Sequence, residues 1–217
     1  MEWNEAGSTE ISGRDSTVWV WNFPKAQLVC TCVDDEGHAP ARVLAISGSL
    51  RRASSNSALV EAVGRLAPVT VEMSIYRGLA DLPPFNPDLD GDGSPEAVTR
   101  FRARLSASDA VLMSIPEYAH GVPGVVKNAL DWVVGSGELV GKPIALINAS
   151  ARAKHAWASL AYTLAVMSAR VVLDASITVS LGSMLDADGI IADAAMSNKL
   201  RSAIDALARA AREARPF

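Results

Sequence analysis

The chain has 217 residues, of which 49% are hydrophobic and 20% are charged, so it can bury a sizeable core as one domain with at most an appendage. No apolar run approaches the roughly 20 residues that a bilayer-spanning helix needs, and this composition excludes disorder of the whole chain. The net charge of −4 argues against a broad nucleic-acid-binding surface. Two cysteines are too few for a disulfide scaffold or a four-cysteine zinc site.

The first forty residues differ from the rest of the chain. Residues 1–40 have a net charge of −5, whereas residues 41–217 have a net charge of +1. This acidic segment has the pattern of neither a secretory signal nor a transit peptide. A short strand is expected at residues 17–21, and Cys30-Thr31-Cys32 is half of a metal site that no second pair completes, with His38 a poor third ligand.

We therefore predict that residues 1–40 are an N-terminal extension, disordered or loosely attached, with a non-native start of the reading frame as one explanation of it. Residues 41–217 are predicted to be the functional domain, with no metal site. This domain contains neither of the two cysteines, so any redox chemistry in it needs a bound cofactor.

From residue 41 onward, short apolar runs alternate with segments of helical period. Strands are expected at 41–47, 69–75, 110–115, 143–148 and 171–179, the last with a break near Asp174. Helices are expected at 54–67, 95–107, 124–134, 155–168 and 193–212, and a proline-rich loop at 82–88. This alternation predicts an α/β fold, a doubly wound five-stranded parallel sheet with helices on both faces. Ligands of such sheets bind beyond the carboxyl ends of the strands.

The loop after the first strand, residues 47–57, joins a strand to the start of a helix. Its hydroxyl, amide and guanidinium groups and the helix N-terminus together favour a phosphate. It lacks both the G-x-G-x-x-G and the G-x-x-x-x-G-K-[ST] patterns of nucleotide-binding loops, so a terminal phosphate monoester fits better. The alternative is that Ser54 and Ser55 only cap the helix and that Arg51 and Arg52 are solvated.

The segment after the third strand, residues 115–132, contains two prolines and two glycines that fix a turn close to a planar ligand. Tyr118 and His120 are candidates to flank a ring, although Tyr118 also fits an ordinary surface aromatic. His120 is either a hydrogen-bond donor to a substrate oxygen or, more readily, a wall of the pocket. Leu130 and Trp132 are predicted to be core residues.

These motifs resemble the NADPH-dependent FMN reductase family, which includes quinone, chromate and azo-compound reductases. The residues that carry the resemblance are Gly48-Ser49-Leu50-Arg51 with Ser54 and Asn56, Leu82-Pro83-x-Phe85-Asn86-Pro87-Asp88, Pro116-Glu117-Tyr118, and Pro123-Gly124-x-x-Lys127-Asn128-Ala129-Leu130-Asp131-Trp132. The resemblance runs from about residue 41 to residue 215 and leaves the extension out.

The resemblance implies a flavodoxin-like fold and hydride transfer from NADPH, with NADH left open, through FMN to a quinone or free flavin. It also implies a cytoplasmic homodimer or homotetramer with a small-molecule acceptor as substrate and neither nucleic acid nor membrane as partner. The flavin carries the chemistry, so no side chain is expected to be catalytic. The implied cofactor-binding residues are Ser49, Arg51, Ser54, Ser55, Asn56, Ser57, Pro116, Glu117, Tyr118, His120, Gly121, Ser150 and Arg152.

Two departures from the family pattern bear on flavin binding. Ala119 stands where the family commonly has asparagine, which removes a polar contact. The loop at 149–155 lacks the usual glycines, which limits the approach of its backbone to a ligand. Arg152 and Lys154 in this loop are equally well interpreted as contacts to the extra phosphate of NADPH or as solvated side chains.

The motifs can also be compared with those of two other classes of function. A flavin-binding module that carries electrons or signals without turning over NADPH fits the same motifs. A serine hydrolase does not, because the chain has no G-x-S-x-G elbow and His38, His120 and His155 have no partner spacing.

Overall fold

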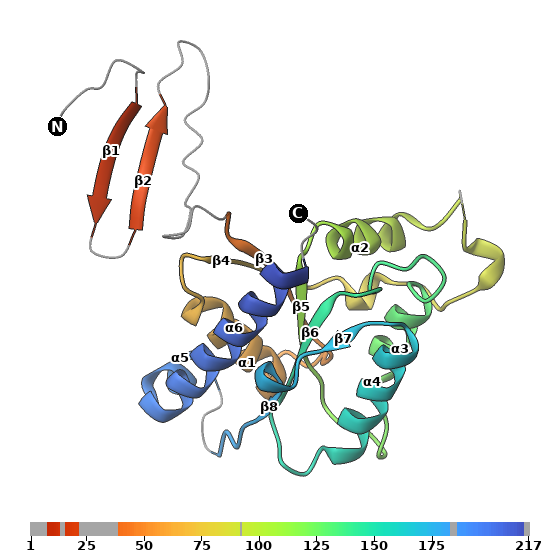
Figure 1. Ribbon diagram of the computed structural model, residues 1–217. Coiled ribbons are helices and arrows are strands. Elements are labelled where there is room, and N and C mark those ends of the chain that lie inside the picture. Colours follow the sequence, from red (N-terminus) through yellow and green to blue (C-terminus); the bar gives the residue numbers. More distant parts are fainter. Residues whose placement is uncertain (1–7, 14–15, 22–38, 92, 183–185, 215–217) are drawn as a thin grey trace.

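The computed structural model describes residues 8–13, 16–21, 39–91, 93–182 and 186–214. Within the extension it describes two strands, β1 (Ser8–Gly13) and β2 (Ser16–Trp21), which pair antiparallel (Figure 1). The strand predicted at residues 17–21 is confirmed. Both cysteines and His38 lie outside the described residues. The division of the chain into residues 1–40 and 41–217 stays a prediction.

The rest of the described chain is built on a parallel sheet with the strand order β4-β3-β5-β6-β7, and β8 also pairs with β6. The predicted break near Asp174 is present, since a 3₁₀ turn, η3 (Leu173–Ala175), separates β7 from β8. The strands are β3 (Ala41–Ser47), β4 (Val71–Tyr76), β5 (Ala110–Ser114), β6 (Pro143–Asn148), β7 (Arg170–Val171) and β8 (Ile177–Thr178).

All five predicted helices are present, and the described residues contain a sixth that the sequence pattern did not predict. The helices are α1 (Ser55–Leu66), α2 (Glu96–Ser106), α3 (Gly124–Asp131), α4 (Lys154–Val166), α5 (Ala187–Ala192) and α6 (Ala194–Ala214), with 3₁₀ turns η1 (Leu79–Asp81) and η2 (Pro87–Leu89). The missed helix, α5, is six residues long and contains a glycine, so its sequence has no clear helical period. Among the described residues, no helix is long and apolar enough to cross a membrane.

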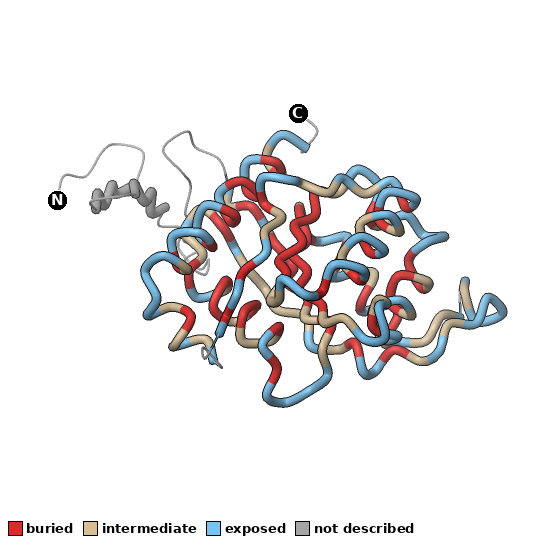
Figure 2. The backbone as a smooth tube through the Cα atoms, turned by 90° about the horizontal axis from the view of Figure 1, so that it is seen from below, coloured by how far each residue is buried: buried red, intermediate tan, exposed pale blue. Residues whose placement is uncertain are grey.

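The helices cover both faces of the sheet, as Figure 1 shows, with α1, α5 and α6 on one face and α2, α3 and α4 on the other. Successive residues of β3 alternate between two separate apolar clusters, Val43 and Ala45 in one and Leu44 and Ile46 in the other. The central strands β3, β5 and β6 are buried along almost their whole length, as the buried segments at the centre of Figure 2 show, which is why they read as continuous apolar runs. The predicted flavodoxin-like α/β fold is confirmed.

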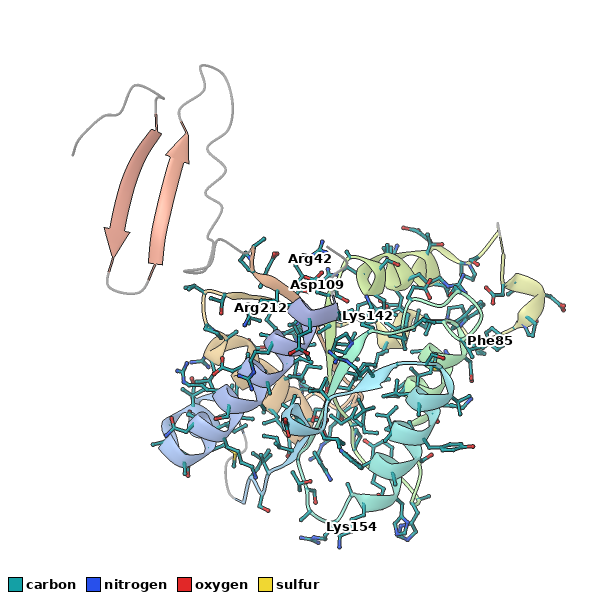
Figure 3. The ribbon with its side chains drawn as sticks, in the orientation of Figure 1. Arg42, Phe85, Asp109, Lys142, Lys154 and Arg212 are labelled. Carbon is teal, nitrogen blue, oxygen red and sulfur yellow. The ribbon has the colours of Figure 1, made fainter. Side chains whose placement is uncertain are left out.

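Charged side chains fasten the amino edge of this sheet. The Arg42 guanidinium bonds to both carboxylate oxygens of Asp109, at 3.2 and 2.9 Å, and Lys142 donates to the carbonyls of Leu105 and Ser108 at the end of α2. Figure 3 shows Arg42, Asp109 and Lys142 together at this edge and Lys154 at the opposite one. Burial lowers the pKa of Lys142, while the two carbonyls replace the water that its ammonium group loses.

The most recognisable part of the sequence, residues 127–132, fastens the proline-rich loop. Asn128 accepts from the Phe85 N–H at 2.8 Å and donates to the Pro83 carbonyl at 2.9 Å. The Trp132 indole N–H donates to the same carbonyl at 2.8 Å, and its ring meets Phe85 edge to face at 5.0 Å. Trp132 and Leu130 are buried, so their prediction as core residues is confirmed.

Replacing the amide of Asn128 is expected to release this loop. Asn128→Ala leaves the Phe85 N–H without its acceptor and removes one of the two donors to the Pro83 carbonyl, which costs about 1–3 kcal/mol of unfolding free energy. Lys127→Ala, in the same helix turn, loses only an exposed ion pair with Asp131 and is expected to cost about 0.5 kcal/mol or less. Chemical denaturation of both variants measures the difference, and equal losses would contradict the role given to Asn128.

Candidate functional site

The ends of β3, β5 and β6 bring three loops to the carboxyl edge of the sheet. Ser47, the last residue of β3, lies directly opposite Ser114, the last residue of β5. The loops that follow, residues 48–54, 115–123 and 149–153, are the three segments in which the sequence predicts ligand contacts. Because the strands are parallel, these loops share one edge, where sheets of this kind bind ligands.

A buried polar network holds the first loop against the neighbouring strand. The Gly48 N–H donates to the Ser114 carbonyl at 2.8 Å, and the Ser114 hydroxyl donates to Asn56 Oδ1 at 2.9 Å. Gly48 admits no side chain, because a Cβ there would lie 2.7 Å from methyl groups of Ile115 and Val126. Asn56, predicted to hold a phosphate, therefore first serves to position the loop.

The same loop presents many hydrogen-bond donors at the start of α1. Ser54 caps the helix by accepting from the Ser57 N–H at 3.4 Å, and the backbone N–H groups of residues 52–56 have no acceptor among the described residues. Arg51 and Arg52 are exposed, and within the described chain their guanidinium groups pair with nothing. The helix cap and the phosphate site are thus compatible, since the cap leaves these donors free.

The Ser49 and Ser57 hydroxyls are held by local hydrogen bonds. Ser49 Oγ accepts from the Arg51 N–H at 3.3 Å, and Ser57 Oγ lies 2.9 Å from Ser47 Oγ. A hollow of about 280 Å³ adjoins them, and its far wall includes Tyr76 and Arg77 at the end of β4. The sequence analysis missed these two wall residues, although they follow a predicted strand at the same edge.

The second loop ends in a tight left-handed turn at residues 118–121. Tyr118 and Gly121 exchange two backbone hydrogen bonds of 3.2 and 2.9 Å, and both residues between them have positive φ angles, 49° at Ala119 and 61° at His120. This is the geometry of a two-residue hairpin turn. The N–H groups of Glu117, Ala119 and His120 have no acceptor in the described part of the chain, so this turn offers donors to a planar ligand.

The carboxylate of Glu117 joins this turn to helix α4. Its Oε2 accepts from the Ala156 N–H at 2.9 Å, and its Oε1 lies 3.1 Å from His120 Nδ1. The hydrogen bond from Ala156, with a smaller contribution from His120, holds the pKa of Glu117 below its ordinary value. Glu117 is therefore ionised at neutral pH and does not serve as an acid.

The third loop uses most of its backbone donors internally. Asn148 accepts from the Ser150 N–H and donates to the Ala153 carbonyl, each at 3.0 Å. Ser150 in turn accepts from the N–H groups of Arg152 and Ala153 through its hydroxyl and carbonyl. Among the predicted ligands here, only the side chains of Ser150 and Arg152 are left to contact a cofactor, which agrees with the expectation drawn from the missing glycines.

Ala119 is expected to strain the turn that it occupies. A left-handed residue with a Cβ costs roughly 1–2 kcal/mol, and asparagine adopts this conformation more readily. Ala119→Asn is therefore expected to raise the unfolding free energy by about 0.5–1 kcal/mol, measured by thermal or chemical denaturation. Ala151→Asn, at an exposed loop residue without positive φ, is the control, and an equal gain there would count against strain at residue 119.

Comparison with known proteins agrees with this geometry. Residues 41–185 match the family model described as NADPH-dependent FMN reductase. An NAD(P)H-dependent FMN reductase of Pseudomonas aeruginosa is 45% identical over 114 residues, 51% of this chain and 60% of that protein. A quinone reductase of Pseudomonas putida is 39% identical over 111 residues, 50% of this chain and 59% of that protein. The chain thus spans about 60% of the length of these curated relatives.

A solved structure is similar over a larger share of the chain. The flavoenzyme NAD(P)H:(acceptor) oxidoreductase FerB of Paracoccus denitrificans has a TM-score of 0.67 and 31% sequence identity, and covers 80% of this chain and 98% of its own. The match to the family model begins at residue 41, the first residue of the predicted domain. The chain belongs to the NADPH-dependent FMN reductase family.

Proposed function

We propose that the protein is an FMN-dependent NAD(P)H oxidoreductase that passes hydride from NADPH to an acceptor such as a quinone or free flavin. The observation that carries this proposal is the convergence of two donor-rich loops at one edge of the sheet. One surrounds a helix N-terminus with hydroxyl and guanidinium groups, which suits a phosphate. The other presents unpaired N–H groups on a flat turn, which suits the polar edge of a flavin ring.

The residues on this edge divide between the two ends of FMN. We assign the phosphate to Ser49, Arg51, Ser54, Ser55, Asn56 and Ser57, and the ring system to Pro116, Glu117, Tyr118, His120, Gly121, Ser150 and Arg152. Asn56 is buried beneath the loop and its Oδ1 is bonded to Ser114, so we assign it to the inner side of the phosphate site. Glu117 contributes its backbone N–H, because its carboxylate is already bonded to α4.

The cofactor, when bound, supplies the hydride chemistry. This chain binds the phosphate, orients the ring between the two loops and leaves space for a second ring to stack. Tyr118 is 57% exposed and provides an apolar surface beside that space. Arg152 and Lys154 are exposed cations at the start of α4. They favour NADPH, because its extra phosphate is the group that they would contact. NADH lacks only this phosphate and stays open as a second hydride donor.

We further propose that residues 41–217 form the reductase domain, with residues 1–40 as an extension, and that the protein is a cytoplasmic homodimer or homotetramer. Helix α4 supports self-association, because it exposes an uncharged stripe in successive turns. Tyr162 and Val166 are 74% and 66% exposed, and Ala158 and Ala165 flank them. A surface of this kind marks an interaction site. The acidic net charge of the chain speaks against a nucleic-acid partner.

Anaerobic titration with NADPH tests the activity. The FMN-loaded protein is expected to lose its visible flavin absorbance stoichiometrically with added NADPH and to regain it when a quinone is added. A protein that binds FMN but is not bleached would be a flavin-binding electron carrier or signalling module instead. Failure to bind FMN would overturn both functions.

The phosphate loop has a test of its own. Arg51→Ala removes a cation without a described partner, so the fold is expected to persist while FMN affinity falls about tenfold or more, as for the loss of one charge-assisted hydrogen bond. Affinity for riboflavin, which lacks the phosphate, is expected to stay the same. Fluorescence quenching measures both affinities, and equal losses would show that Arg51 does not contact the phosphate.

A further inference from the structure

Two histidines and a carboxylate meet where the second loop approaches helix α4, and the proposed function makes no use of their side-chain chemistry. The rings of His120 and His155 lie edge to face with their centroids 4.5 Å apart. His120 Nδ1 is 3.1 Å from Glu117 Oε1. The contact between the two rings joins the loop after β5 to the first turn of α4, on the same edge as the proposed flavin site.

The hydrogen bonds decide which nitrogen of His120 holds its proton. Because the Ala156 N–H keeps Glu117 ionised, that carboxylate can only accept, and His120 Nδ1 must be the donor. The other ring nitrogen, Nε2, is left free to exchange a proton. The His120 side chain is 78% exposed, so Nε2 is accessible to a ligand above the sheet edge.

Quinone reduction needs a proton as well as a hydride. Hydride transfer leaves a negative charge on a quinone oxygen, and a positioned acid there lowers the barrier. Imidazole is the side chain best matched to this role near neutral pH. Of the groups that contact its ring, Glu117 is ionised and can only accept a hydrogen bond. His155 has no hydrogen-bond partner for its ring among the described residues.

We propose that His120 is the general acid that protonates the acceptor oxygen and that Glu117 is its positioning residue, an inference that rests on the proposed function. His120 Nε2 first takes a second proton from solvent, so that the ring is an imidazolium. The hydride then brings two electrons and one hydrogen to the quinone, and Nε2–H of this imidazolium brings the proton, so the product is a neutral hydroquinone. The imidazole is left neutral with its Nδ1–H on Glu117, and it regains the Nε2 proton from solvent. The titratable groups that contact its ring are Glu117 and His155.

The test compares two acceptors in His120→Asn, since asparagine tolerates the left-handed backbone at this position. Re-oxidation of the reduced protein by a quinone is expected to slow about 100-fold, the low end of the effect of losing a general acid, because solvent also reaches the site. Re-oxidation by ferricyanide, which takes electrons without a proton, is expected to stay the same. Added imidazole is expected to restore the quinone rate alone.

Ser159→Ala, one helical turn beyond His155 and exposed, is the matched control and is expected to leave both rates unchanged. Equal slowing with quinone and ferricyanide in His120→Asn would show a structural role only, and an unchanged quinone rate would exclude His120 as the acid. Either result overturns the proposal.

A second readout needs no flavin. In ¹⁵N NMR spectra of the cofactor-free protein, recorded at a pH where the imidazole is neutral, His120 is expected to carry its proton on Nδ1, and Glu117→Gln is expected to shift the tautomer toward Nε2. The Nε2 tautomer in the unmodified protein would refute the arrangement by itself. If NADPH fails to bleach bound FMN, the proposed function falls and this inference with it. If NADPH bleaches bound FMN normally but His120→Asn or the NMR spectra give the opposing result, the role of His120 as the acid is excluded and the proposed function stands.

Discussion

The buried hydrogen bond between Ser114 of β5 and Asn56 of α1 fixes the geometry on which the candidate site depends. Ser114 is fully buried and Asn56 is 8% exposed. Removing either side chain would leave its partner unsatisfied and would lower the free energy of unfolding by about 1–3 kcal/mol. The carbonyl of the same serine accepts from Gly48, where no side chain fits. The phosphate loop is thereby tied to both a strand and a helix before any ligand arrives, and this reduces the entropy cost of binding.

A second coupling joins the other two loops through a helix that lacks a cap of its own. Ala153 precedes α4 and has no side chain that can accept from the first turn, so Glu117 supplies that acceptor from the loop after β5. The position of α4 and the conformation of the turn at 118–121 therefore depend on one carboxylate. A change in either element alters the other, and both border the space in which an acceptor would stack.

The elements of the fold were predictable from sequence because both faces of the sheet are covered. The central strands β3, β5 and β6 then read as apolar runs, and the longer helices bury a face of period 3.6. The exceptions have local causes. The helix expected at residues 124–134 ends at Asp131, so its last turn is absent, and α5 is too short to show a period. The break near Asp174 was visible as a charged residue within an apolar run.

The site was predictable only in part, since sequence shows which residues reach an edge but not which way they turn. Ser54 was expected either to cap α1 or to bind phosphate, and the cap leaves the neighbouring donors free for the second role. That Asn56 points into the core, and that Glu117 bonds to a helix 39 residues away, depends on contacts between distant segments. The pairing of His120 with His155 is of the same kind, because no periodic pattern relates the two residues.

The residues that identify the family differ from those that would distinguish this member of it. The run from Lys127 to Trp132 is the most specific motif, yet Asn128 and Trp132 bond to the proline-rich loop. The departures from the family pattern are concentrated at Ala119 and in the loop before His155, on the exposed rim. Because a buried network positions the loop proposed to bind phosphate while exposed side chains form that rim, substitutions on the rim are expected to alter the proposed acceptor reaction without disturbing the proposed phosphate site.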